Sequence, residues 1–187
     1  MIHESVLVHP AAYVADSDVG KNSVIWQFAS VIRGAVVGDG VTIGSGACVD
    51  GARLGDRSIL SANACIFPGH VVGADCFIGP GAVLCNDHWP RALKAGFSGF
   101  IPAVAMKEDL HKQQACIVVE DGASIGANAT ILPGIVLGED CMVAAGSTVG
   151  VNVPANCVHH RSGRVVPITN ELEQLRMDTR TRHARGI

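Results

Sequence analysis

Residues 119–131 read VEDGASIGANATI, and in this stretch an aliphatic residue returns at every sixth position. The same interval runs through most of the chain. The aliphatic positions are Val8, Val14, Ile25, Val31, Val37, Ile43, Val49, Leu60, Ile66, Val72, Ile78, Leu84, Val119, Ile125, Ile131, Leu137, Val143 and Val149. An α-helix would repeat its apolar residues about every 3.6 positions. The interval of six therefore indicates short strands joined by corners.

A second column, of small side chains, accompanies the aliphatic one. The residue four places after the aliphatic is usually small, as at Ala29, Ala47, Ala64, Ala82, Ala123 and Ala129. One large and one small inward side chain per six residues suit a short strand and a corner, and the β-branched excess favours strands. A fixed hexapeptide interval is typical of a parallel β-helix, in which three hexapeptides form a triangular coil of about 18 residues. We therefore predict an all-β parallel β-helix over residues 1–155.

The pattern is irregular at three places before residue 85. The interval shortens to five residues between Val14 and Val19 and again between Val49 and Leu54, which predicts shortened corners. His70 occupies the small column. We expect this histidine either to pack inside the coil or to turn outward at a corner.

The interval stops altogether between Leu84 and Val119. Residues 85–116 contain prolines and glycines and then a polar run, 107–114. A long insertion in a solenoid is usually a functional or interaction loop. Residues 156–187 form a C-terminal extension, in which Asn170 and Glu173 have the spacing of a helix cap. We predict a short C-terminal helix there, followed by a basic, solvated end.

Composition argues against several classes of protein. The formal net charge of −3 gives no basic field for nucleic acid. No apolar run approaches the roughly 20 residues that span a bilayer, and residues 1–5 lack a signal-peptide profile. We therefore expect a cytoplasmic protein without membrane contact. The seven cysteines include no C-x-x-C motif, so we expect no disulfide framework and no bound metal.

Three local motifs stand out from the repeat. Residues 24–28 read VIWQF, residues 77–83 read FIGPGAV and precede the segment 86–91, NDHWPR, and residues 122–131 read GASIGANATI. In this order they resemble the second coil, the active-site segment and the following coil of the nucleotide-sugar 3-N-acetyltransferases. That family belongs to the hexapeptide-repeat acyltransferases, and the resemblance spans residues 8–155.

The resemblance implies more than the repeat does. It implies a left-handed β-helix, a homotrimer with active sites between subunits, and acetyl-CoA as the acyl donor. The implied acceptor is the amino group of a nucleotide-linked 3-amino sugar that is used in lipopolysaccharide O-antigen or S-layer glycans. No metal is implied.

Four residues at the start of the loop are the candidates for catalysis and substrate binding. Asn86 matches the family position that meets the substrate amine, although an asparagine can also form the turn where a strand ends. Asp87 can bond the sugar or the amine, or cap the loop. His88 has the intrinsic pKa of a general base, but it can also be incidental. Arg91 can pair with a pyrophosphate or bind the backbone of the loop.

The resemblance points to the edge of the last coils for the coenzyme. Small residues at Ala127, Ala145 and Gly146 would let a pantetheine arm lie against the backbone, although small residues also serve corner packing. Arg161 and Arg164 are candidates for the coenzyme phosphates by charge alone.

Three alternatives remain open at this point. A hexapeptide O-acetyltransferase acting on a small hydroxyl acceptor would need a true base and would give His88 more weight. A γ-class carbonic anhydrase needs three facing histidines, whereas His70, His88 and His111 are scattered. A non-catalytic β-helix would bind no coenzyme A.

Overall fold

A computed structural model describes residues 1–87 and 117–169. These residues form three sheets whose strands are two or three residues long. The nine-stranded sheet contains β1 (Leu7–Val8), β4 (Val24–Ile25), β7 (Thr42–Ile43), β10 (Ile59–Leu60), β13 (Phe77–Ile78), β16 (Ser124–Ile125), β19 (Met142–Val143), β21 (Cys157–His159) and β22 (Val165–Pro167).

The other two sheets have seven and six strands. The seven-stranded sheet contains β2 (Tyr13–Val14), β5 (Ser30–Ile32), β8 (Cys48–Asp50), β11 (Cys65–Ile66), β14 (Val83–Leu84), β17 (Thr130–Ile131) and β20 (Thr148–Val149). The six-stranded sheet contains β3 (Ser17–Val19), β6 (Ala35–Val37), β9 (Arg53–Leu54), β12 (Val71–Val72), β15 (Val118–Val119) and β18 (Val136–Leu137).

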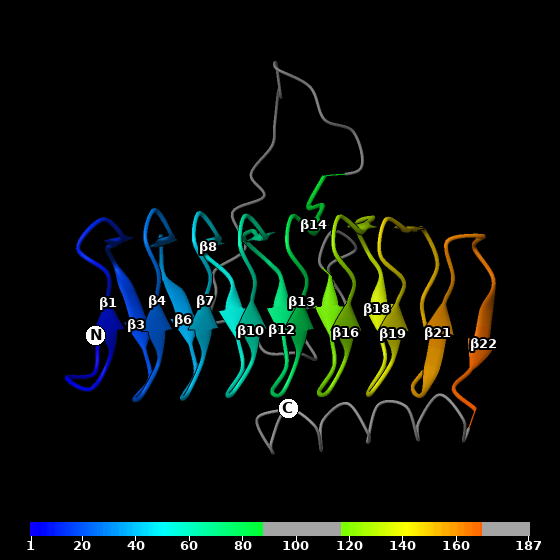
Figure 1. Cartoon of the computed structure of the whole chain (residues 1–187), viewed down its shortest axis with the longest axis horizontal. Coiled ribbons are helices and arrows are strands. Elements are labelled where there is room, and N and C mark those ends of the chain that lie inside the picture. Colours follow the sequence, from blue (N-terminus) through cyan, green and yellow to red (C-terminus); the bar gives the residue numbers. More distant parts are fainter. Residues whose placement is uncertain (88–116, 170–187) are drawn as a thin grey trace, which may run out of the picture.

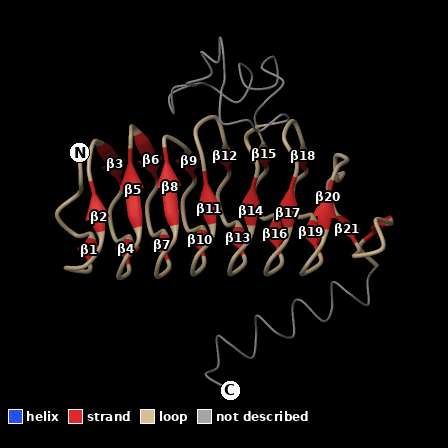
Figure 2. Ribbon diagram, turned by 90° about the horizontal axis from the view of Figure 1, so that it is seen from above, coloured by secondary structure: helices blue, strands red, loops and turns tan. Residues whose placement is uncertain are grey.

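The chain visits the three sheets in rotation, so each strand pairs with the strand one coil further on. Figures 1 and 2 show the coils stacked along the long axis of the molecule. In the described part of the chain, the strand pairs are parallel except β21 with β22. This is an all-β parallel β-solenoid of about seven turns, and it is consistent with the left-handed β-helix that the resemblance implies. Among the described residues there is no helix, and the predicted C-terminal helix lies outside them.

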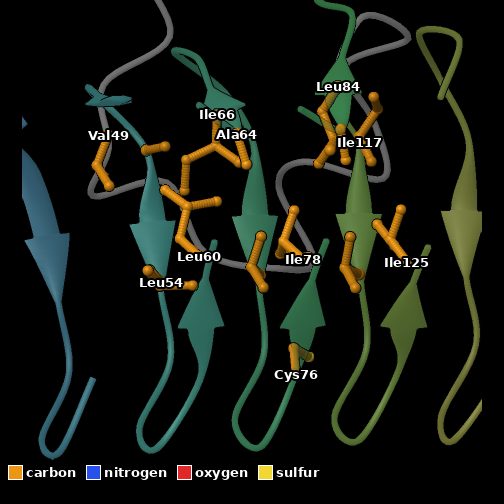
Figure 3. Close-up of a cluster of buried hydrophobic side chains, with 14 of the residues drawn as sticks. Val49, Leu54, Leu60, Ala64, Ile66, Cys76, Ile78, Leu84, Ile117 and Ile125 are labelled. Carbon is orange, nitrogen blue, oxygen red and sulfur yellow. The ribbon is translucent and has the colours of Figure 1, made fainter. Parts of the chain in front are cut away.

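The core consists of the predicted columns. Ile25, Ile43, Leu60, Ile78 and Ile125 follow one another in register along the nine-stranded sheet and are at most 1% exposed. Figure 3 shows part of this stack pointing into the interior. Burying one such side chain is worth about 1.5–3 kcal/mol, so the columns dominate the stability of the solenoid. The narrow interior also explains why aromatic residues such as Trp26 and Phe28 lie exposed at the surface.

Glycine follows the aliphatic residue because successive coils approach closely there. A Cβ built on Gly79 would lie 2.6 Å from the backbone nitrogen of Ala127, and one built on Gly126 would lie 2.4 Å from that of Ala145. Both contacts are with backbone atoms, which cannot move aside without breaking the hydrogen bonds between neighbouring coils. The glycine column is therefore a steric requirement of the coil spacing.

The strand register confirms both shortened corners. The last residues of β2 and β3, Val14 and Val19, are five positions apart. Val49 in β8 and Leu54, the last residue of β9, are also five positions apart. The register also locates the insertion. Val118 pairs with Val136, a single coil further along the chain, whereas Val71 pairs with Val118 across the whole of the loop. The extra residues are inserted between β14 and β15, and the coil resumes in register after them.

The solenoid continues beyond residue 155. β21 pairs with β19, and β22 folds back against β21 as an antiparallel strand. Both strands belong to the segment for which a separate C-terminal extension, residues 156–187, is predicted. Within the described ranges, no helix is long and apolar enough to cross a membrane.

Candidate functional site

The loop root is Cys85, Asn86 and Asp87, where the chain leaves the seven-stranded sheet before reaching the six-stranded one. The Cys85 backbone N–H still donates to the carbonyl of Ile131, at 2.9 Å, so the root is tied to the next coil. Asn86 and Asp87 are half-buried. The structure therefore places two of the predicted catalytic residues together at one corner. His88 and Arg91 lie outside the described residues.

His70 lies at the same corner, one coil before the loop root. It is 1% exposed, which confirms that it packs inside the coil rather than turning outward. Its Nδ1 accepts a hydrogen bond from the backbone N–H of Phe67, at 3.0 Å. Burial lowers the pKa of His70 to about 4, while the Cys85 backbone raises it by a smaller amount. The imidazole is therefore neutral at pH 7.

An ion pair lies along this corner, with Asp50 two coils and Arg33 three coils before the loop root. The guanidinium of Arg33 binds the carboxylate of Asp50 through both its Nε and an Nη atom. The Asp50 side chain is 9% exposed and that of Arg33 is 57% exposed. The hydrogen bond to Asp50 raises the pKa of Arg33, so the guanidinium stays charged at neutral pH. The hexapeptide pattern did not indicate this pair, because neither residue belongs to the large or the small inward column.

The predicted coenzyme residues lie near one another at a different corner, between the nine- and seven-stranded sheets, where Ala127 is half-buried and the others are exposed. The backbone N–H of Gly146 donates to the carbonyl of Ala127, at 2.8 Å, and Ala145 is adjacent and exposed. A Cβ built on Gly146 would lie 3.8 Å from Cδ of Arg161. Arg164 lies on the same turn as Arg161, between β21 and β22, and its carbonyl accepts from the N–H of His160. We call Ala127, Ala145, Gly146 and Arg161 the edge strip.

The edge strip suits a long, polar-ended ligand by its shape. Gly146 has a φ of +70°, so the corner turns without a side chain, and the backbone is open on that side except for Arg161. Arg161 and Arg164 are exposed and supply positive charge at the end of the strip. Donors of this kind pair well with phosphate oxygens.

The loop root and the edge strip are separate within one chain. They lie at opposite ends of the strands of the seven-stranded sheet, since β14 runs from the corner at Gly79–Gly81 to Cys85. At about 3.3 Å per residue, the five or six residues between the two corners span roughly 15–20 Å. Reacting atoms must approach to about 3–3.5 Å. The loop root and the edge strip of one chain are therefore at separate corners, and a ligand on the strip would have to extend across this span to reach Asn86 of the same chain.

No metal site is found in the part of the chain that the structure describes. There, no three His, Cys, Asp or Glu side chains gather in a way that would hold a metal ion. The ring of His70 is occupied at Nδ1 by a backbone N–H. His159 is buried on the inner side of β21, in register with Val143.

Comparison with known proteins identifies the repeat. A model described as bacterial transferase hexapeptide (six repeats) matches residues 116–151, and one described as hexapeptide repeat of succinyl-transferase matches residues 34–68. Both matched segments are therefore hexapeptide repeats, in agreement with the interval of six residues.

Particular relatives are distant. A bifunctional protein GlmU from Streptococcus equi subsp. zooepidemicus is 30% identical over 147 residues, which cover 79% of this chain and 30% of the relative. One from Nitratidesulfovibrio vulgaris is 26% identical over 164 residues, covering 88% of this chain and 31% of the relative. The chain thus spans about a third of the length of the curated relatives that it matches.

Solved structures share the fold. A hexapeptide transferase family protein from Anaplasma phagocytophilum has a TM-score of 0.51 and 19% identity, covering 97% of this chain and 92% of that one. A mutant of AntD, an N-acyltransferase from Bacillus cereus, has a TM-score of 0.51 and 16% identity, covering 96% and 89%. That structure is a complex with dTDP-4-amino-4,6-dideoxyglucose and coenzyme A. At these identities the likeness establishes the β-helix fold.

Proposed function

We propose that this protein transfers an acetyl group from acetyl-CoA to the amino group of a nucleotide-linked sugar. The observation that supports this proposal most is the pairing of two features on one solenoid. The insertion begins with Asn86 and Asp87 at one corner, and the open, positively charged edge strip lies along another corner. The finer assignment, a 3-amino sugar for lipopolysaccharide O-antigen or S-layer glycans, rests on the resemblance of residues 77–91. The AntD complex is a precedent for a nucleotide sugar and coenzyme A on this fold.

In the proposed reaction the neutral amine attacks the thioester carbonyl. A new C–N bond forms, the C–S bond breaks, and coenzyme A leaves as a thiolate. The Asn86 side-chain oxygen accepts a hydrogen bond from the amine and aims its lone pair at the carbonyl. The amine loses one proton, which goes to His88, to water or to the leaving thiolate. Asp87 and Arg91 bind the sugar nucleotide, and the edge strip holds the coenzyme.

We also propose a homotrimer in which each site combines the loop root of one subunit with the edge strip of the next. The separation of these two features within one chain supports the shared site. The outer face of the nine-stranded sheet supports association, because its central positions are uncharged and Leu7, Ile59 and Phe77 are at least 40% exposed. The reaction would take place in the cytoplasm, where its thioester donor is made.

The activity is tested with the purified protein, acetyl-CoA and a panel of UDP-, dTDP- and GDP-linked amino sugars. Release of free thiol with at least one amino sugar, and none with the matching hydroxyl sugar, is expected. Thiol release with hydroxyl sugars alone would transfer the assignment to an O-acetyltransferase. No release with any member of either panel would refute acyl transfer to sugars.

The shared site is tested by mixing two inactive variants. Asn86→Ala removes the amine acceptor, and Ala145→Trp fills the edge strip from an exposed position. If sites form between subunits, unfolding and refolding the two together restores about a quarter of the sites, because one competent loop root then meets one competent strip. If each chain supplied both parts, the mixture would stay inactive.

A further inference from the structure

Phe28 is an aromatic residue in a backbone conformation that suits glycine. Its φ is +62°, in the left-handed region, where a bulky side chain is an outlier. Its N–H donates to the carbonyl of Ala11 in the preceding coil, at 3.0 Å. In each of the next five coils, the residue at the equivalent place also has a positive φ and also donates to the preceding coil. These residues are Gly46, Asn63, Gly81, Asn128 and Gly146. The corner itself therefore needs no aromatic residue, and the strain at Phe28 points to a role outside the fold.

Phe28 and Trp26 present their rings at the surface, and we call them the aromatic pair. Phe28 is 73% exposed and Trp26 is 47% exposed. Neither ring packs against another ring in the described part of the chain. A hollow of about 370 Å³ lies beside Trp26 and is lined by Val6, Leu7, Val8, His9, Val24 and Ile25. Two open aromatic rings next to a hollow form a surface on which a planar ring can stack.

The aromatic pair lies on the same corner as the edge strip. This corner runs between the nine- and seven-stranded sheets. In the coils between the pair and the strip, the residues at the corner are glycine, serine, alanine, asparagine and proline, as at Gly44, Ala62 and Gly79. The N–H of Gly46 donates to the carbonyl of Gln27, at 3.0 Å, which ties the pair to the next coil of this path. A path of small side chains therefore connects the aromatic pair with the edge strip.

The loop root lies midway between the aromatic pair and Arg161 along the solenoid. β5, which follows Phe28, is separated by three strand spacings from β14, which leads to Asn86, and Figure 2 shows these strands in line. Three spacings also separate β13, in the coil of β14, from β21, which leads to Arg161. At about 4.8 Å per spacing, each interval is roughly 14 Å. In the proposed trimer, subunits related by rotation about an axis along the solenoid keep the same level, so these intervals also hold for a shared site.

The two ligands of the proposed reaction divide this length between them. The thioester of the coenzyme and the amine of the acceptor meet at Asn86. The edge strip and Arg161 hold the coenzyme on the side of β21, so the rest of the acceptor extends toward the aromatic pair. A nucleotide-linked amino sugar has a diphosphate and a ribose between its sugar and its planar base, which suits an interval of this length.

We propose that Trp26 and Phe28 bind the base of the nucleotide-linked acceptor by stacking. This inference rests on the proposed function and assigns the far end of its acceptor to a place on the solenoid. Stacking on an aromatic ring tolerates every base, because every base has a π-face. The pair therefore selects a nucleotide-linked sugar over a simple sugar phosphate, without selecting one base over another.

Phe28→Asn removes the ring and keeps the fold, because Asn63 and Asn128 adopt the same backbone conformation at this corner. We expect this variant to melt at or above the temperature of the unmodified protein. Its KM for the nucleotide sugar should rise at least fivefold, whereas its KM for acetyl-CoA should not change. Phe28→Tyr, which keeps a ring, should keep both values. Val151→Asn, which removes an exposed apolar side chain from another corner, should also keep both.

Two outcomes of these assays would overturn the proposal. One is an unchanged KM for the nucleotide sugar in Phe28→Asn. The other is a smaller assembly of Phe28→Asn in size-exclusion chromatography, which would assign the aromatic pair to a contact between subunits.

A fluorescence titration tests the aromatic pair without knowledge of the sugar. The chain has two tryptophans, so in a Trp89→Phe background the indole fluorescence reports Trp26 alone. We expect UDP, dTDP and GDP to quench it in a saturable way, inorganic pyrophosphate to leave it unchanged, and Phe28→Asn to weaken the nucleotide affinity at least fivefold. No quenching by any of these nucleotides, or equal quenching by pyrophosphate, would overturn the proposal. Nucleotide quenching without turnover in the sugar assay would refute the proposed function and leave the nucleotide site in place.

Discussion

Gly146 and Gly40 have nearly identical surroundings but different expected roles. Gly146 has a φ of +70° and its added Cβ would lie 3.8 Å from Cδ of Arg161. Gly40 has a φ of +64° and its added Cβ would lie 3.7 Å from Cγ of Arg57. Neither Cβ meets backbone. The two glycines therefore form a matched pair, of which only Gly146 belongs to the edge strip.

Substituting alanine at either glycine should cost the same stability. A left-handed backbone costs an L-residue about 1–2 kcal/mol, and no steric clash adds to it. For a chain of this size, about 1 kcal/mol lowers Tm by roughly 2–4 °C. Calorimetry should therefore show Gly146→Ala and Gly40→Ala melting within a degree or two of each other, both below the unmodified protein.

Their effects on the reaction should differ. In Gly146→Ala the added methyl group stands between the backbone and a ligand lying on the edge strip. We expect KM for acetyl-CoA to rise at least fivefold, equivalent to about 1 kcal/mol of lost binding, with little change in kcat. Gly40→Ala should keep the KM of the unmodified protein. Equal KM values for the two variants, measured by thiol release or by calorimetric titration with coenzyme A, would refute the placement of the coenzyme on this strip.

The remaining predictions concern the loop root and the ion pair beside it. Asn86→Ala should lower kcat at least tenfold in steady-state assays, whereas Asn22→Gly, at an exposed corner with positive φ, should leave it unchanged. His88→Asn should flatten the pH–rate profile if His88 is the base, and a profile like that of the unmodified protein would exclude it. Arg33→Met should lower the free energy of unfolding by about 1–3 kcal/mol, because it leaves the mostly buried Asp50 carboxylate without its partner. In urea denaturation, adding Asp50→Asn to Arg33→Met should recover part of this lost free energy, because it removes the unpaired charge. Burial lowers the pKa of His70 from about 6.5 in the unfolded chain to about 4, so unfolding takes up a proton between these pH values. The free energy of unfolding should therefore fall by up to about 3 kcal/mol as the pH falls from 6.5 to 4. Urea denaturation of His70→Leu should show no such dependence on pH.

The repeat could be predicted from the sequence because each coil imposes the same steric rules. A column of large aliphatics, a column of small residues and a glycine at the close approach all follow from the coil spacing. The sequence also grouped Ala127, Ala145, Gly146 and Arg161 as coenzyme candidates, and in the structure the N–H of Gly146 donates to the carbonyl of Ala127 while Arg161 lies near Gly146; their role in binding coenzyme A stays a prediction. Residues far apart in the sequence lie next to one another there, because coils of nearly constant length place equivalent positions directly above each other.

The features that the sequence did not predict are those where the period fails. β21 follows its partner β19 by less than a full coil, and β22 runs antiparallel, so neither continues the hexapeptide pattern. Arg33 and Asp50 stand at corners, where the pattern puts no constraint on side-chain chemistry. For His70 the pattern indicated the position but not the tautomer, which depends on the backbone N–H of Phe67.

The placement of the insertion and the chemistry of the site are connected through the shared corner. The insertion lies between β14 and β15, so the chain leaves the regular coil directly after Cys85 and resumes in register at β15. The N–H of Cys85 still donates to the carbonyl of Ile131, so the loop starts from a residue that the next coil holds in place. His70 lies one coil before this point and is buried, with its Nδ1 accepting from the backbone N–H of Phe67. Asn86 is the residue directly after Cys85, so the regular coil sets where its side chain begins, as a reaction that depends on close alignment of the amine would require.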